Sequence, residues 1–537
     1  MKFNIKNLVF LVTTVAVTGI SCKKETFNNT NPDSVTAVTV DYRTVLPPSM
    51  TSTATIIDGG SFKFLQNWMG YWARSGSYQD VTDEESYVFD NDFNVGVWNN
   101  LYANATNYNF VVNKAKAAGA GTYEAIARIM KSMDFQMLVD VYGNVPYSGA
   151  FLGVEGRTPA YDKGQDIYDS LFVDIDRAIA LLKDPAATSA DLNVNIAAND
   201  LIYGGNTTNW IKFANTLKLR MIMHAFQAPG FDVAGKIAVI EAEGSGYLGA
   251  GESATLNPGY STSKPAPFWR ANVLTEAGAA TANGAIERAN AYAVGPNPGG
   301  PAQGYYTWDG DPREDQFYTP PSSGVQRGIA YGEIAGTNSD NTGDKLSTID
   351  GVGYSPDGAA SDAWIFTDFE SLFLQAEARE RNIITSGPSA EVLLNSGMDQ
   401  SFIYVGLSAS DADTYRTNNA TYPDVDYNGV SQGPGLPAGG LFTILSQKWF
   451  ALNGFSVLEV WTDWRRTDVE YGTGGGFLPG PPLSINPARP GALGIPIRLF
   501  YPQNEYNFNG PNVAAQGTID VSAASTSATG RIFWDIN

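Results

Sequence analysis

Hydrophobic residues recur at helical spacing in the first third of the chain. One stripe, at i, i+3, i+4 and i+7, consists of Trp98, Leu101, Tyr102 and Ala105. A second stripe consists of Ile126, Met130, Met133 and Met137. Gly119 and Gly143 follow the two stripes, and glycine commonly ends a helix because it adopts a left-handed backbone without strain. The pattern predicts a helical hairpin over residues 96–142.

The same spacing returns in three later segments, which predict further helical pairs over 163–226, 362–405 and 439–466. In the second of these segments, Thr367 and Glu370 have the spacing of a capping box, in which each side chain accepts a hydrogen bond from the backbone of the other residue. These residues predict where the first helix of that pair begins.

The stretch from about 230 to 360 has a different character. It is rich in Gly, Pro, Ser and Asn and shows no sustained periodicity, which is typical of loops. Helical hairpins of this size favour a tetratricopeptide-like scaffold, whose repeat is about 34 residues long. We therefore predict a mostly α fold: a scaffold of about four helical pairs that carries a large irregular, loop-rich half.

Charge and residue counts narrow the classes of function. The 537-residue chain has a net charge of −21, which repels phosphate backbones and anionic lipids, so we expect no nucleic-acid partner. Cys22 is the only cysteine and His224 the only histidine, which excludes an internal disulfide and a cysteine-rich zinc site. His224 lies on an apolar stripe, three residues after Met221, so we expect it in the core. A Ser-His-Asp triad would have to use this one histidine, so we expect no enzyme.

The N-terminus predicts export. Lys2 and Lys6 precede an uncharged run over 8–20, which is shorter than the roughly 20 residues of a membrane-spanning helix. The segment resembles a bacterial lipoprotein signal over residues 1–21, with Cys22 as the lipidated first residue; an ordinary secretory signal is the alternative. Residues 22–40 are polar and predict a flexible tether, which leaves 41–537 as the folded domain.

Five stretches, in this order, resemble the SusD/RagB family of outer-membrane nutrient-binding lipoproteins, and more narrowly its SusD-like branch. They are "DVYGNVPYSGA" (140–150), "DLIYGGNTTNWIKFANTLKLR" (200–220), "FESLFLQAEARER" (369–381), "QKWFALNGFSVLEVWTDWRRTD" (447–468) and "RLFYPQNEYNFN" (498–509). The resemblance implies four tetratricopeptide-like helical pairs, a place at the outer membrane of a Gram-negative bacterium, and a SusC-like, TonB-dependent transporter on which the protein closes as a lid. It also implies a nutrient ligand, in most relatives an oligosaccharide or glycan and in some a peptide.

Aromatic residues outside the helical stripes are the candidates for ligand contact. Sugar rings stack their C–H faces on such side chains, while sugar hydroxyls bind polar neighbours. We expect the ligand to contact Trp72, Tyr78, Asp80, Trp269, Tyr306 and Trp308. The aromatic residues on helical stripes, which we assign to the core instead, are Trp98, Tyr102, Trp210 and Trp449.

Other polar motifs have structural interpretations that we prefer. Arg465 and Arg466 are expected to pair with acids such as Asp463 or Glu459 rather than to bind an anion. The acidic loops 309–316 and 339–351 lack a complete calcium-loop spacing, so we expect no metal and no cofactor, with a calcium ion as the alternative.

These observations favour a surface lipoprotein that binds an oligosaccharide or glycan fragment and delivers it to its transporter. A peptide-binding protein of the same architecture is the first alternative. A surface hydrolase, and a lid that binds nutrient weakly or not at all, are further alternatives.

Overall fold

The computed structural model describes residues 40–295, 304–431, 438–467, 481–491, 493–522 and 530–536. The leader, the tether up to residue 39 and Cys22 lie outside the described residues. Among the described helices, none combines the length and the hydropathy that a bilayer crossing requires.

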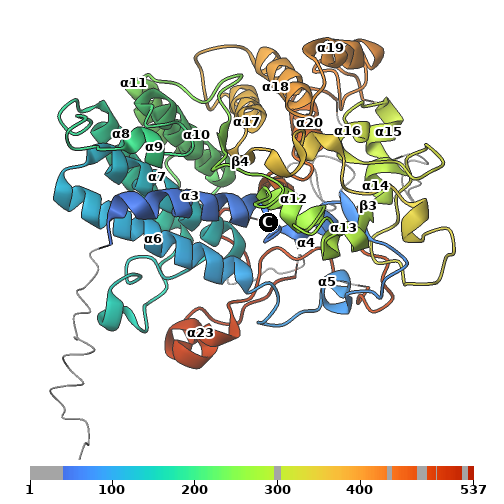
Figure 1. Cartoon of the computed structure of the whole chain (residues 1–537), viewed down its shortest axis with the longest axis horizontal. Helices are drawn as coiled ribbons and strands as arrows, with labels where there is room; N and C mark the ends of the chain where they lie inside the picture. The colour runs from blue at the N-terminus through green and yellow to red at the C-terminus, as the bar shows by residue number, and fades with distance from the viewer. Residues whose placement is uncertain are drawn as a thin grey trace, which may run out of the picture.

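The first half of the scaffold is a layer of long helices around α7 (Gly121–Tyr142), which is packed between α6 (Gly96–Ala118) and α8 (Gly164–Lys183). Helix α3 (Tyr42–Asp58) lies along α6, and α10 (Thr207–Ala225) lies beside α8 (Figure 1). Every residue of α7 is buried, including those outside its apolar stripe. A helix with neighbours on several sides has no solvent face, so its stripe understates its burial.

The second half of the scaffold contains α17 (Asp368–Glu380), α18 (Ala390–Tyr404), α20 (Leu441–Ala451) and α21 (Val457–Arg466). Helix α17 packs on both α18 and α20, and the short α19 (Ala409–Asn418) follows α18. The mostly α fold with tetratricopeptide-like pairs is thereby confirmed.

The start of α17 differs from its prediction in one detail. Thr367 Oγ1 accepts from the backbone of Glu370 at 3.3 Å, as expected. The carboxylate of Glu370 does not return to Thr367 but binds Arg220 on α10. The capping box is therefore half formed, because Arg220 binds the Glu370 carboxylate that would otherwise accept from the backbone of Thr367. A complete capping box occurs at Ser408 and Asp411.

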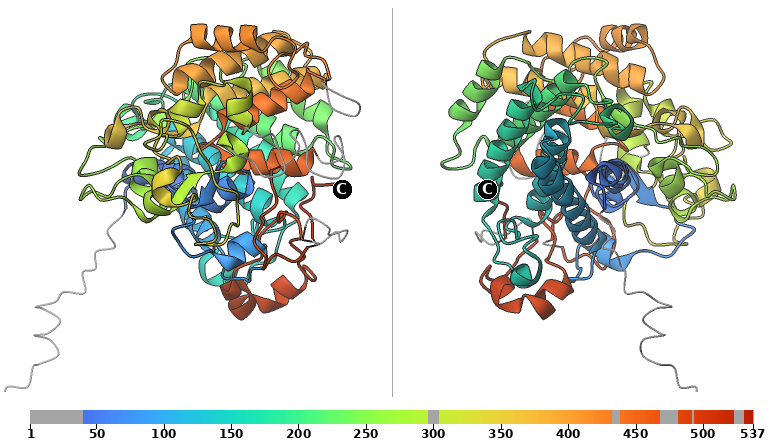
Figure 2. Two further views of the ribbon diagram at one scale, coloured as in Figure 1. Left: turned by 90° about the vertical axis from the view of Figure 1, so that its right-hand side faces the viewer. Right: turned by 60° about the vertical axis from the view of Figure 1, so that its left-hand side comes forward.

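The loop-rich half contains two small antiparallel sheets. Strand β1 (Trp72–Arg74) pairs with β3 (Glu287–Ala289), with Trp72 opposite Ala289, and β2 (Ala254–Leu256) pairs with β4 (Ala363–Phe366). Its short helices are α4 (Lys63–Trp68), α5 (Thr82–Ser86), α12 (Pro267–Asn272), α13 (Ala282–Ile286), α14 (Ala291–Val294), α15 (Tyr305–Asp309) and α16 (Glu314–Phe317). The remaining short helices are α9 (Ile196–Asn199), α23 (Gln503–Phe508) and α24 (Gly510–Ala514). The views in Figure 2 show the yellow-green elements around α12–α16 on one side of the molecule and α6–α8 on the other.

Three helices of ten or more residues were not predicted. Helix α3 contains Pro47 and Pro48, which are unusual inside a helix, and many small polar residues. Helix α11 (Val233–Glu243) buries only Ile237 and Ile240. Helix α19 is polar and likewise buries two residues. Apolar residues at helical spacing are few in α3 (Leu46, Met50 and Ala54) and in α11 (Val233, Ile237 and Ile240), and α19 has only its two buried residues.

One continuous core joins the helical scaffold to the loop-rich half. Trp449 on α20 stacks on Tyr71, with ring centroids 4.7 Å apart, and also contacts Tyr306 of α15. Trp98, Trp210 and Trp449 are buried as predicted, whereas Tyr102 is half-buried and donates its hydroxyl hydrogen to Pro146 O at 2.7 Å. Aromatic packing therefore fixes the loop-rich half on the scaffold.

Candidate functional site

Of the six predicted ligand-contact residues, two are buried and four are at least partly exposed. Trp72 is 2% exposed, and its strand is hydrogen-bonded to β3. Tyr306 is fully buried and donates to Phe450 O at 2.6 Å. A ring that stacks on a sugar needs a free face, so the expectation that these two rings contact ligand is wrong. Both are part of the core.

Three aromatic candidates reach the surface. Trp308 on α15 is 54% exposed, and Tyr78, in the turn after β1, is 39% exposed. Trp269 on α12 is half-buried, and its ring lies against Gly358, where a Cβ would be 3.7 Å from it. Asp80 is half-buried near Asn486 Nδ2, at 3.4 Å.

These surface residues come from three separate parts of the chain. They lie on α15, on α12 and in the turn after β1, and within the described parts of the chain no ring contact or hydrogen bond joins one to another. Trp308 is the most exposed of the described tryptophans that the sequence singled out. It therefore remains the first candidate for stacking on a sugar, with Tyr78, Asp80 and Trp269 as separate candidates.

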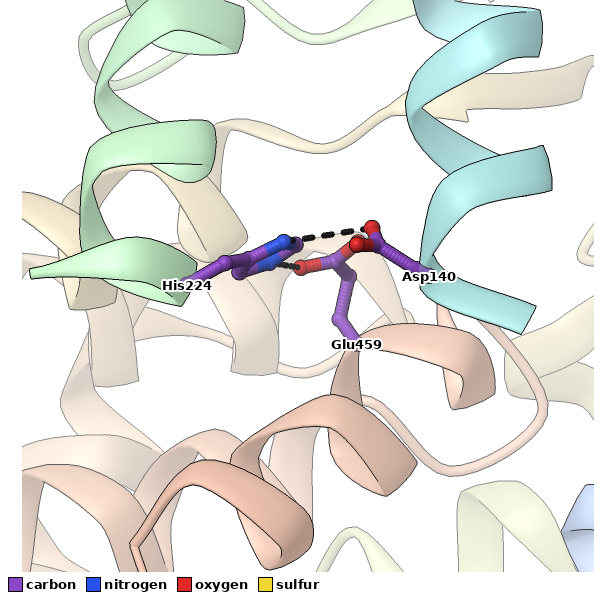
Figure 3. A group of neighbouring side chains, drawn as sticks. All are labelled: Asp140, His224 and Glu459. Carbon is purple, nitrogen blue, oxygen red and sulfur yellow. Dashed lines mark hydrogen bonds and ion pairs between the residues drawn. The ribbon is translucent and has the colours of Figure 1, made fainter. Parts of the chain in front are cut away.

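A separate group of buried ionisable residues lies inside the scaffold. Figure 3 shows the imidazole of His224 of α10 facing the carboxylates of Asp140 of α7 and Glu459 of α21. Its Nδ1 lies 3.2 Å from Asp140 Oδ2 and its Nε2 lies 2.7 Å from Glu459 Oε2. Burial alone would lower the pKa of His224, but the carboxylates of Glu459 and Asp140 raise it to about 9.

The surrounding groups saturate this cluster. Asp140 also accepts from Tyr168 Oη at 2.5 Å and from Trp534 Nε1 at 2.9 Å. Burial opposes ionisation of Glu459, yet Arg220 and His224 lower the pKa of Glu459 well below its usual range. All three members are buried.

Such a trio has the donor types of a metal site, but in this structure its members are paired with one another. Both imidazole nitrogens face carboxylate oxygens, and a protonated imidazole has no lone pair for a metal. The cavity beside Glu459 measures about 20 Å³, which is enough for a single water molecule. The cluster is a buried ion network, and the core position predicted for His224 is confirmed.

Further buried ion pairs extend the network across the scaffold. Arg220 binds Glu370 at 2.5 Å, and Arg466 binds Glu377 at 2.6 Å and Asp463 at 2.7 Å. The predicted pairing of Arg466 with Asp463 is confirmed. Arg465 differs: its guanidinium donates to the carbonyls of Asp140 and Ile497 and stacks on Trp461.

The acidic loops have partners within the protein. Asp311 binds Arg313 at 2.6 Å, and both are buried. Asp309 accepts from Tyr415 Oη at 2.9 Å, and Asp340 lies 3.3 Å from Lys345 Nζ. Among the described residues, only one group of three His, Cys, Asp or Glu side chains is close enough to share an ion, and it consists of Asp140, His224 and Glu459.

Comparisons with known proteins point to one family. Residues 34–502 match a SusD-like family model described as starch-binding and associating with the outer membrane. A chitin-binding SusD homologue from Flavobacterium johnsoniae is 21% identical, with a TM-score of 0.68 over 92% of this chain and 99% of that one. A SusD-like protein from Bacteroides thetaiotaomicron is 21% identical, with a TM-score of 0.66 over 93% of this chain and 99% of that one. No curated protein matches the sequence.

Proposed function

The chain belongs to the SusD-like family of starch-binding proteins associated with the outer membrane, and we propose that it captures a glycan fragment and delivers it to a SusC-like, TonB-dependent transporter. The match to the family model over 34–502 is the observation that carries this proposal. The chitin-binding homologue, which has the same fold, supports a carbohydrate ligand.

Trp308 is the residue that we propose stacks on the sugar. The residue is more than half exposed, while Thr307 Oγ1 donates to Val294 O at 3.1 Å and so anchors α15. One aromatic face contributes modestly to binding, so we expect micromolar to millimolar dissociation constants for a short oligosaccharide. Weak binding suits a protein that must release its cargo to a partner.

Calorimetric titration with maltoheptaose and chitohexaose tests the proposal. Trp308→Ala should weaken binding of the preferred glycan with an unchanged melting temperature, because the ring contributes little to the core. Trp72→Ala is the matched contrast: it removes a buried ring and should lower the melting temperature. Intact binding by Trp308→Ala would transfer the site to Trp269 or Tyr78.

The same samples separate binding from turnover. Chromatography of the glycan after long incubation should show no shortened product, because we propose capture without chemistry. Release of product would favour the hydrolase alternative. Protection against thermal unfolding by a peptide, with none by either glycan, would favour the peptide alternative.

The transporter partner is tested on native membranes. We expect the protein to copurify from mild detergent with a TonB-dependent outer-membrane transporter. Purification of the protein alone, under conditions that keep other outer-membrane complexes intact, would contradict delivery to such a partner.

A further inference from the structure

A cavity of about 340 Å³ lies between the end of α11 and the facing side of α17 and α18. Figure 1 shows α11 at the upper left and α17 and α18 at the top, whereas α15, which carries Trp308, lies at the upper right. Gly246 and Gly387 line the cavity, and a Cβ at either position would meet no atom within 4 Å. The volume is within the range of about 300–1,000 Å³ that is typical of small-molecule sites.

Two side chains in the wall have polar atoms without a partner in the described part of the chain. The Tyr247 hydroxyl is buried and makes no hydrogen bond. Gln375 donates its amide to Leu248 O at 3.0 Å and to Ser371 Oγ at 3.1 Å, and its own carbonyl oxygen accepts nothing. Burial makes an unpaired polar atom costly, so the Tyr247 hydroxyl favours a ligand or water that pairs with it.

The wall also carries one charge of each sign. Arg379 on α17 donates to the carbonyls of Ile384 and Pro388, both at 2.9 Å, and no described carboxylate lies within ion-pair distance of it. Glu241 on α11 supplies the negative charge, and Ser386 Oγ lies 3.4 Å from its Oε1. The two charges offset each other, so the wall favours neither an anion nor a cation.

We propose that this cavity is a second saccharide site, which holds one or two neutral sugar units away from Trp308. Ile240 and Leu393 offer apolar contact for sugar C–H groups, and Gln375, Tyr247 and Arg379 offer hydrogen bonds to hydroxyls. A hydrocarbon would leave these polar groups unpaired, and a charged ligand would meet a like charge. The cavity and its polar groups are observed in the structure, and only the class of ligand, a saccharide, rests on the proposed function.

Two substitutions test the site without disturbing the core. Tyr247→Phe removes only a hydroxyl that has no partner among the described residues, so the fold should be unaffected. Ser386→Trp places a large ring at an exposed position of the cavity wall and should block it. Tyr260→Phe is the control, because its hydroxyl is also buried and unpaired but lies outside the cavity.

The measurement is saturation-transfer NMR with maltose and with diacetylchitobiose, on the Trp308→Ala background. We expect one disaccharide to bind, with affinity reduced about two- to tenfold by Tyr247→Phe, abolished by Ser386→Trp and unchanged by Tyr260→Phe. If wild type binds but the Trp308→Ala protein does not, the proposed function survives and the second site is refuted. Binding on this background that neither cavity substitution weakens would also refute it.

Discussion

Buried charges at single residues hold this scaffold together. His224 lies between two carboxylates with no exposed surface, so its positive charge is balanced within the protein. Removing water from three ionisable groups is costly unless each is paired. A pKa of His224 raised to about 9 means that folding favours its protonated form.

The pKa of His224 can be observed directly, because it is the only histidine in the chain. In a protein without a histidine tag, one imidazole signal should titrate in an NMR experiment. We expect its midpoint near 9 rather than near the ordinary value of 6.5. A midpoint at or below 6.5 would mean that burial outweighs the two carboxylates.

The same shift makes stability depend on pH. A folded-state pKa above the unfolded value means that the folded protein binds the proton more tightly, so this contribution is complete below pH 6.5 and is lost as pH rises through about 9. It is on the order of 3 kcal/mol, given about 1.4 kcal/mol for each pH unit. The difference in unfolding free energy between wild type and His224→Gln should shrink over that interval. A constant difference would show that the proton contributes nothing.

Trp210 tests the core at a single ring. It is fully buried, and its Nε1 donates to Asp200 Oδ2 at 2.7 Å. Trp210→Ala should lower the unfolding free energy by about 3–5 kcal/mol, measured by denaturant titration. Trp210→Phe keeps a ring and should cost less. An unchanged melting temperature in Trp210→Ala would contradict the burial.

Residue-scale prediction worked for helical aromatics and failed for part of the loop aromatics. Trp210 and Trp449 have neighbours at i+3 or i+4 that reveal a buried face. Trp72 and Tyr306 lie in short elements without periodicity, and their burial depends on β3 and on α20, which are distant in sequence. Nothing local distinguishes them from the exposed Trp308.

At the scale of elements, ion pairs connect helices that are far apart in the sequence. Arg466 on α21 binds Glu377 on α17, and Arg220 on α10 binds Glu370 at the start of α17. Helix α17 is therefore bound to both halves of the scaffold by buried guanidinium groups. Because such hydrogen-bonded ion pairs are directional, they restrict how the helices can be oriented more than apolar contacts alone do.

Breaking one of these pairs should have a large effect. Arg466→Met leaves Glu377 with Arg381 alone, and we expect a loss of about 3–5 kcal/mol in unfolding free energy, because a buried charge loses its main partner. The matched control is Lys345→Met, whose pair with Asp340 is exposed and should contribute less than about 1 kcal/mol. If the two substitutions lower the unfolding free energy equally in denaturant titrations, the buried pair contributes no more than the exposed pair and the prediction is wrong.

Elements with a sustained stripe were predictable, and elements held by neighbours were not. The stripes of α6 and α7 predicted both helices. Helix α3 is stabilised by packing on α6 and β4 despite two internal prolines, and no sequence pattern records that contact. The short strands of the loop-rich half depend on partners more than 100 residues away, so local patterns contain no signal for them.

At the scale of the molecule, the long helices α6–α8 and the loop-rich elements around α12–α16 lie on different sides (Figure 2), and the core joins them. This arrangement leaves Trp308 on the surface of the loop-rich side while the helical pairs remain a rigid support. The fold was predictable from repeated hairpins and family resemblance. The ligand surface was not, because it depends on which loop residues the core leaves exposed.

Attachment to the membrane is the remaining question at this scale, and it depends on a residue outside the described structure. We expect Cys22 to be the lipidated first residue of the mature protein, because it follows an uncharged run with two preceding lysines. Acyl chains hold a protein by burying CH₂ groups, at about 0.8 kcal/mol each, so their loss removes stable anchoring. Cys22→Ser should therefore shift the protein from the outer-membrane pellet to the soluble fraction of lysed cells, detected by immunoblot. The comparison must be repeated in a strain that lacks the proposed transporter, since binding to such a transporter would retain unlipidated protein. If Cys22→Ser still sediments with outer membranes in that strain, the anchor is a different part of the chain.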